Sequence, residues 1–352
     1  MNIDSKISQT ITLCRFPLIV LVVMLHSGAA YSSVEGGGLA QFFSAYFTRI
    51  AVPLFFCISG YLFFYNFSLE SYFVKIRKRI KNLLVPYFFW NIVFIAAFFV
   101  FQTLFQTSFD RKPISDWALS DFLWSFWDIR HIHGYELNSG GVPFHSHLWF
   151  LRDLFMMALL SPLFFFLLKY MKSVIVFVAL LLWLFLPFDF FYYIKNESFL
   201  FFLIGGYMQI NAINILAFNK KQIIKGISLV TIINLLLAPL FDYSSFVGAI
   251  CTHMYILSGC YVFFVLMSYI NNEKKKFILS KLSDSTFFIY GCHGLFVAIL
   301  SKFILSRVSL TTINISISFV STWLIALSAS LLLYLIIKRF IPWALIFTGG
   351  KR

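Results

Sequence analysis

The chain has 352 residues, of which 60% are hydrophobic and 20% aromatic, and only 12% carry a charged side chain. This composition, with a mean hydropathy of +0.86, excludes an ordinary soluble domain and predicts an integral membrane protein. In a soluble protein, the net charge of +14 would suggest a nucleic-acid partner. If both termini are cytoplasmic, however, most Lys and Arg residues fall on the inner face of the membrane. The basic charge is then a positive-inside topology signal, and no nucleic acid is expected.

Apolar windows long enough to cross a hydrocarbon layer of ~30 Å recur along the chain. We place ten of them, at residues 11–30, 46–66, 83–103, 148–168, 173–190, 198–214, 223–240, 246–270, 285–305 and 313–337. An outer loop is predicted at about 104–147 and a cytoplasmic tail at about 338–352. The chain is therefore predicted to be one all-α, polytopic membrane domain, residues 1–352, with about ten transmembrane helices and both termini cytoplasmic.

Arg15 and His26 lie eleven residues apart in the first window. Because a helix turns ~100° and rises ~1.5 Å per residue, the two side chains share a face and lie ~16 Å apart along the axis. An ionisable group at the bilayer centre costs ~2.5–3.5 kcal/mol and usually faces a protein interior or a wet cavity. His26 is the best candidate for a general base, because an imidazole takes and returns protons near neutral pH. The alternatives are a hydrogen bond between helices for His26 and a topology signal for Arg15.

A basic segment, KIRKRIKNLLVP, follows the second window and contains Arg77 and Arg79, on the same predicted face as Arg15. Clustered Arg and Lys bind phosphates well, although any inside-facing loop has this composition. Coenzyme A carries its phosphates on a nucleotide and its thioester at the end of a long, uncharged arm. The ~16 Å rise between Arg15 and His26 is comparable to this arm when extended. We therefore predict that the phosphates bind on the inside and that the acyl group reaches His26 near the outer side.

Further polar residues lie in or beside the windows. Arg49 opens the second window, and Arg152 and Asp153 open the fourth. Because Arg152 and Asp153 are adjacent, they are predicted to point in different directions and need not pair. His253 and His293 fall in the eighth and ninth windows. Each is either a residue of the active cavity or a histidine merely buried between helices.

The predicted outer loop is rich in Trp and Asp. Aromatic rings stack on sugars and carboxylates accept hydroxyl protons, so this composition suits sugar binding; an amphipathic segment at headgroup depth is the alternative. Its histidines are expected to be solvated, with His147 the strongest candidate because it adjoins the fourth window; they are His131, His133, His145 and His147. The five cysteines fall in the windows without CxxC or His-rich spacing, so neither a disulfide nor a metal site is expected.

Together, several segments resemble the acyltransferase family 3 membrane proteins. The similar segments are the Arg-x10-His pair of the first window, RIAVPLFFCISGYLF, the basic stretch that runs into LLVPYFFW, HLWFLRDL, FFLIGGYM and LSDSTFFIYGCH. They occur in order from residue 15 to residue 293 and so cover nearly the whole chain.

The resemblance implies an O-acetyltransferase of the bacterial inner membrane, which moves acetyl from acetyl-CoA onto a hydroxyl of a cell-surface glycan such as O-antigen, capsule or exopolysaccharide. Acetyl-CoA is then the co-substrate, a glycan or lipid-linked glycan the acceptor and membrane lipid the surroundings, with no metal. The site residues that the resemblance implies are Arg15, His26, Arg49 and His293 for catalysis, and Arg15, Arg77, Arg79 and Tyr290 for binding acetyl-CoA.

Two other functions stay open. A transporter or flippase for a lipid-linked sugar should show paired helix breaks in its two halves, and no such pairing is found among Pro53, Pro162, Pro187 and Pro239. An acyl-donor relay would pass acetyl to a partner transferase, because some family members carry a soluble outer transferase domain that this chain lacks. In either kind of transfer, His26 acts as a base or as a transient acyl carrier.

Overall fold

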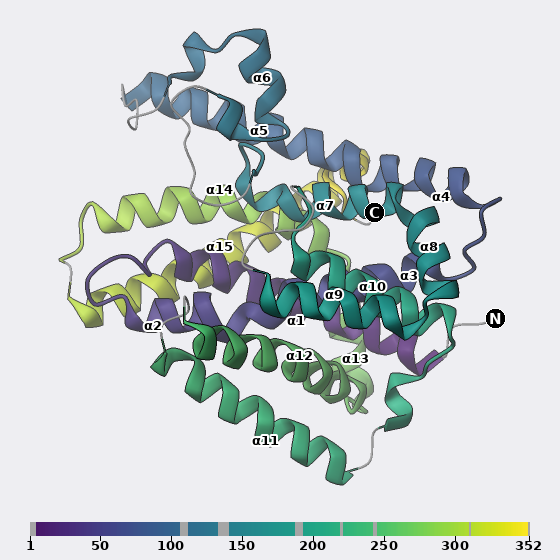
Figure 1. The fold of residues 1–352 in the computed structure, drawn as a ribbon. Helices are drawn as coiled ribbons and strands as arrows, with labels where there is room; N and C mark the ends of the chain where they lie inside the picture. The colour runs from purple at the N-terminus through teal and green to yellow at the C-terminus, as the bar shows by residue number, and fades with distance from the viewer. Residues whose placement is uncertain are drawn as a thin grey trace.

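The computed structural model describes residues 5–105, 112–132, 141–186, 193–218, 221–241, 245–309 and 311–350. Within these ranges the regular structure is helical (Figure 1). The α-helices are α1 (Ser5–Ala29), α2 (Gly38–Gln41), α3 (Ala51–Phe64), α4 (Tyr72–Arg79), α5 (Val85–Phe105), α6 (Leu119–Ser125), α7 (Trp149–Leu159), α8 (Ser161–Tyr170), α9 (Ser173–Phe185), α10 (Asn196–Ile210), α11 (Lys221–Leu237), α12 (Phe246–Ser268), α13 (Glu273–Ser283), α14 (Thr286–Leu305), α15 (Thr312–Phe340) and α16 (Leu345–Thr348). The prediction of an all-α membrane protein is confirmed.

The predicted number of ten spans is not confirmed. Over the described residues, seven helical stretches are long and apolar enough to cross a membrane, and they are Ser5–Ala29, Gly38–Phe64, Tyr72–Leu104, Lys221–Leu240, Phe246–Ser268, Thr286–Leu305 and Thr312–Phe340. The predicted fourth span is two helices, α7 and α8, bent by 64°, and Pro162 lies in the first turn of α8. With 13 and 15 residues, α9 and α10 are shorter than a full span. Ten spans and cytoplasmic termini stay predictions.

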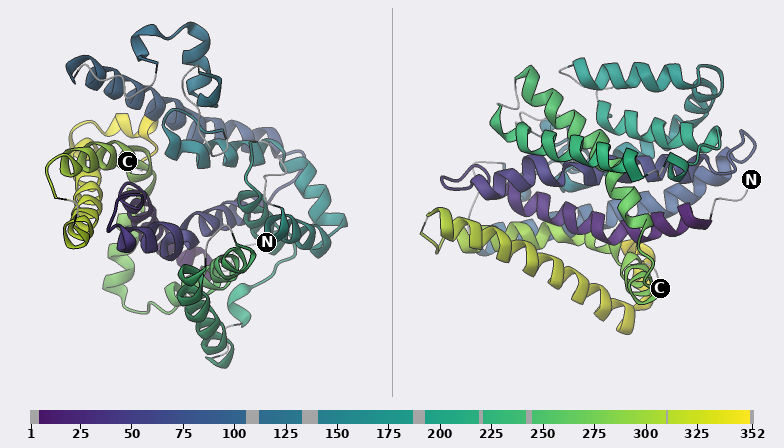
Figure 2. Two further views of the ribbon diagram at one scale, coloured as in Figure 1. Left: turned by 60° about the vertical axis from the view of Figure 1, so that its left-hand side comes forward. Right: turned by 90° about the horizontal axis from the view of Figure 1, so that it is seen from below.

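Helix α1 lies inside the bundle and packs against α3, α12, α14 and α15 (Figures 1 and 2). Its Cys14, Leu18 and Ile19 are fully buried. The first predicted window is therefore a central helix, and its Arg15 and His26 are partly buried, whereas Lys6 near its start is exposed. This arrangement agrees with the expectation that such groups face an interior.

Helices α3 and α10 touch through their backbones. A Cβ added at Gly60 would lie 2.1 Å from the carbonyl oxygen of Phe202, and one added at Gly205 would lie 1.9 Å from that of Cys57. Only glycine permits this approach, which is the small-residue packing common between membrane helices. The contact holds the end of α3 beside α10 and so fixes one wall of the bundle.

The predicted outer loop builds a small core of its own beside α5, with α6 above it in Figure 1. This core consists of Ile95, Ile129, Ile132, Val142 and Phe144, with Trp117 and Trp124 packed against it. At least part of the aromatic content therefore serves packing. Burial alone would raise the pKa of the Asp128 carboxyl in this loop. The hydrogen bonds that Arg130 donates and the positive charge of Arg130 outweigh this effect, so the pKa of Asp128 is below its ordinary value.

The cysteines lie in the helices, as expected. Cys14, Cys251, Cys260 and Cys292 are buried, Cys57 is partly buried, and each is a free thiol.

Candidate active site

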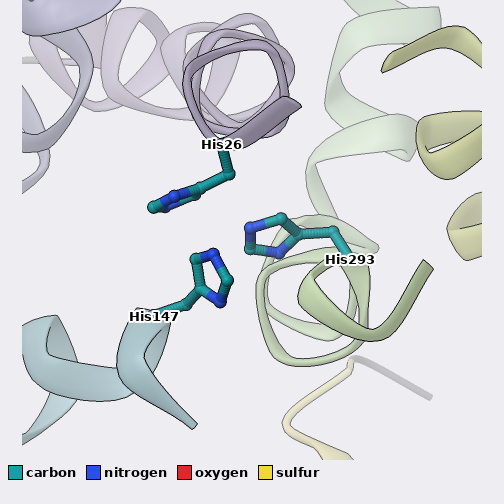
Figure 3. Close-up of side chains that lie close together, drawn as sticks. All are labelled: His26, His147 and His293. Carbon is teal, nitrogen blue, oxygen red and sulfur yellow. The ribbon is translucent and has the colours of Figure 1, made fainter. Parts of the chain in front are cut away.

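Three imidazoles meet at one point of the bundle, although they come from distant parts of the chain. His26 comes from the last turns of α1, His147 from the 3-10 turn Ser146–Leu148 that precedes α7, and His293 from α14. The ring centroids of His26 and His147 are 3.9 Å apart, with the rings nearly perpendicular. The His293 centroid lies 5.3 Å from that of His26 and 5.1 Å from that of His147. Figure 3 shows the three rings pointing toward one another. We call these three residues the histidine cluster.

The orientation of His293 follows from its backbone contacts. Its Nδ1 lies 3.0 Å from the carbonyl oxygen of Ile289 and 2.8 Å from that of Tyr290. Because carbonyl oxygens only accept hydrogen bonds, Nδ1 carries the proton and Nε2 the lone pair. His293 is fully buried. The sequence predicted that His293 lies in a membrane span. In the structure, its Nε2 lone pair faces the interior of the bundle.

The loop histidines do not behave as a group. His145 was expected to be solvated, but it is fully buried; its Nε2 donates to the carbonyl oxygen of Gly291 at 3.0 Å, and its ring stacks on Phe94. This expectation was wrong because the loop folds back onto α14. His131 is partly exposed, and His133 lies outside the described residues.

His253, the remaining candidate, does not join the histidine cluster. Its ring lies 4.1 Å from that of Trp183 on α9. It therefore serves as a comparison residue, since it is a histidine of a membrane helix that makes a separate ring contact.

A cavity of about 670 Å³ lies beside α1. Its polar lining includes Arg15, Arg79, Lys81, Asn82, Asp284 and Tyr290. Three of the predicted acetyl-CoA-binding residues, Arg15, Arg79 and Tyr290, thus share one cavity. Lys81 and Asn82 belong to the same basic segment, but their sequence did not distinguish them from its other members.

The cavity and the histidine cluster are neighbours. Along α1 the cavity is lined by Arg15, Ile19 and Val22, and Val22 precedes His26 by about one helical turn. Tyr290 lines the cavity, and its hydroxyl donates to the backbone carbonyl of His147. Arg15, at the basic end of the cavity, and His26, beyond the other end, thus lie along one face of α1.

Two predicted site residues lie elsewhere. Arg77 is exposed in the last turn of α4 and is not part of the cavity lining. Arg49 forms an ion pair with Glu197 of α10, with a distance of 3.5 Å between Nη2 and Oε2. The structure thus gives Arg49 a helix-to-helix contact, and its catalytic role stays a prediction.

Arg152 and Asp153 form an ion pair, contrary to the inference drawn from their adjacency. The Arg152 guanidinium lies 3.1 Å from Asp153 Oδ1 and donates to the carbonyl oxygens of Trp127 and Gly141 at 2.8 and 2.7 Å. Both side chains are buried. Adjacent side chains leave a helix in different directions, but the long Arg side chain curves back far enough to reach the carboxylate. The pair fastens the outer loop to α7.

Comparisons with known proteins complete the description. The Succinoglycan biosynthesis protein ExoH of Rhizobium meliloti (strain 1021) is 27% identical over 220 residues, which are 60% of this chain. The match spans about half of that relative, 56% of its length. No solved structure matches. A sequence model of the Acyltransferase domain family matches residues 9–339, nearly the whole chain. The chain therefore belongs to this acyltransferase family, the family that its sequence segments resemble.

Proposed function

We propose that the chain is an O-acyltransferase of the bacterial inner membrane that moves acetyl from acetyl-CoA onto a hydroxyl of a cell-surface polysaccharide. Family membership supports acyl transfer. The name of the relative in succinoglycan biosynthesis supports a polysaccharide acceptor. The observation that carries the proposal is the cavity that begins at Arg15 and Arg79 and reaches, along α1, to within about one turn of His26.

The donor would bind with its phosphates at the basic end of the cavity. Arg15, Arg79 and Lys81 supply three cationic groups there, and guanidinium groups suit phosphate oxygens in geometry and charge. The apolar lining, which includes Ile19 and Val22, suits the uncharged arm of coenzyme A. A rise of ~16 Å from Arg15 to His26 would place the thioester near the histidine cluster.

In the proposed reaction, a lone pair on His26 accepts the proton of the acceptor hydroxyl as its oxygen attacks the thioester carbonyl carbon. The tetrahedral intermediate collapses when the carbon–sulfur bond breaks. The coenzyme A thiolate then takes the proton from the imidazolium and leaves as the thiol. The products are an acetyl ester of the glycan and free coenzyme A, and no further reactant is needed. In the two-step version, His26 carries the acetyl group before the hydroxyl attacks.

Transfer by this chain alone separates the enzyme from a relay that needs a partner transferase. The purified protein would be reconstituted into vesicles with radiolabelled acetyl-CoA inside and the polysaccharide outside. Labelled polysaccharide is expected from the wild type and from His253→Ala, but none above background from His26→Ala. In vesicles loaded instead with a lipid-linked sugar, export of unacetylated sugar without formation of free coenzyme A would support a transporter.

A further inference from the structure

We infer that His26, His147 and His293 bind a divalent transition-metal ion of the Zn²⁺ type. Three imidazoles are an established ligand set for zinc, with the fourth position left to water or another small ligand. Each residue of the histidine cluster offers one ring nitrogen, and these three nitrogens all lie within 4.8 Å of one another. No metal motif is recognisable in the sequence, because the three ligands come from separate helical segments.

Two ring nitrogens of the histidine cluster lack a hydrogen-bond partner among the described residues. Nε2 of His293 and Nδ1 of His147 are buried and make no hydrogen bond within the described part of the chain. A buried polar atom without a partner is unusual and calls for an explanation such as an ion. A metal ion at the centre of the cluster would satisfy Nε2 of His293, which lies on the side of its ring that faces the other two imidazoles (Figure 3).

The contacts behind His293 are those of a metal ligand. A metal-bound histidine usually donates its other ring N–H to a carbonyl or carboxylate, which fixes the tautomer and the ring orientation. Nδ1 of His293 lies within hydrogen-bond distance of two backbone carbonyl oxygens, those of Ile289 and Tyr290. This leaves Nε2 unprotonated and held in place, as coordination requires.

The spacing fits after a small contraction. Zinc–nitrogen bonds of about 2.0–2.1 Å place tetrahedral ligand atoms about 3.4 Å apart. Since the three nitrogens already lie within 4.8 Å, binding draws any two of them together by no more than about 1.4 Å. Rotations of the three side chains, which point toward one another in Figure 3, can supply this movement.

Gly294 makes room for His147, which lies in the 3-10 turn before α7. A Cβ added there would lie 2.6 Å from Nδ1 of His147, on the side of the ring that faces α14. A methyl group at this position would therefore displace the ring without removing any imidazole.

The inference does not rest on the proposed function, because the ligand geometry exists whatever reaction the chain performs. The two are linked at one point. A lone pair of His26 that holds an ion cannot accept a proton from an acceptor hydroxyl, so the proposed acyl transfer uses the metal-free chain and a bound ion inhibits it.

The test uses the full chain, purified in detergent without a polyhistidine tag and freed of metal with a chelator. Co²⁺ would be titrated and followed by the visible absorption of four-coordinate cobalt, and Zn²⁺ would be counted by mass spectrometry after gel filtration. We expect one ion per chain, displacement of Co²⁺ by Zn²⁺ and an unchanged titration in the matched control His253→Ala. Since loss of a mere outer contact costs about 10–100-fold in metal affinity, His147→Ala and His293→Ala should each lose at least that much.

Three results would overturn the inference. They are no stoichiometric ion in the wild type, wild-type affinity in both cluster variants, or equal loss in His253→Ala. Gly294→Ala keeps every imidazole and gives a second measurement if a histidine variant does not elute as a folded monodisperse protein; it too should bind Co²⁺ more weakly, and wild-type affinity in it would count against the site.

Discussion

Arg79 and Arg77 provide a matched pair that tests the donor site. Both lie at the end of α4, two residues apart, but only Arg79 lines the cavity, whereas Arg77 is exposed. The Arg79 guanidinium also lies 5.3 Å from the centre of the Phe63 ring, which holds it toward the bundle. If Arg79 contacts a coenzyme A phosphate, Arg79→Ala removes a hydrogen bond to a charged group worth about 1.5–3 kcal/mol.

This free energy corresponds to an increase of roughly 10- to 150-fold in the KM for acetyl-CoA. The kcat should change little, because the phosphates lie far from the reacting carbonyl and their binding is the same in ground and transition states. Arg77→Ala should shift KM by less than about threefold, since an exposed charge acts through salt-screened solvent. Both constants would be measured from initial rates of thiol release in proteoliposomes. Equal KM values in the two variants, or a loss confined to kcat, would refute the assignment of this cavity to the donor.

Two glycines allow further predictions. Gly205→Ala would place a Cβ 1.9 Å from the carbonyl oxygen of Cys57 and should destabilise the protein by about 1–3 kcal/mol through overpacking. This loss is measured as a lower thermal unfolding midpoint in detergent. The control Gly226→Ala, which has open space around it, should not lower the midpoint. Gly294→Ala should reduce kcat by on the order of 100-fold, because a misplacement of about 1 Å near the reacting groups costs that much, while the KM for acetyl-CoA stays unchanged. A wild-type kcat in Gly294→Ala would show that the position of His147 does not matter to the chemistry.

Local sequence patterns were sufficient to predict the features of the molecule that depend on a single helix. The all-helical class follows from apolar windows, and the shared face of Arg15 and His26 follows from helix geometry alone. The same reasoning was weaker for the lengths of the helices. Residues 148–168 read as one continuous window, yet Pro162 divides it into two helices bent by 64°.

Pattern was insufficient wherever the site depends on chain segments that meet in space. His145 and His147 lie two residues apart in what reads as a polar loop, and only the return of this loop to α14 buries His145 against Gly291 and places His147 beside His26. Likewise, the sequence does not distinguish Arg77 from Arg79. They differ only in the direction that each side chain takes from the last turn of α4, since Arg79 lines the cavity and Arg77 is exposed. Such distinctions come from tertiary packing, which a single sequence does not encode in any local spacing.

The division of the site along α1 also decides which contacts can select the acyl group. Every acyl-CoA carries the same nucleotide and the same arm, so if the donor binds as proposed, Arg15, Arg79 and Lys81 cannot distinguish acetyl from a larger or charged acyl group. Selection must come from the space between Val22 and the histidine cluster, where the thioester would lie. Because α1 packs against α3, α12, α13, α14 and α15 and its rise is fixed at ~1.5 Å per residue, the distance from the proposed phosphate contacts to His26 is the same for every donor. A longer acyl group must therefore find its room beyond His26 rather than before it, on the side from which the acceptor hydroxyl approaches.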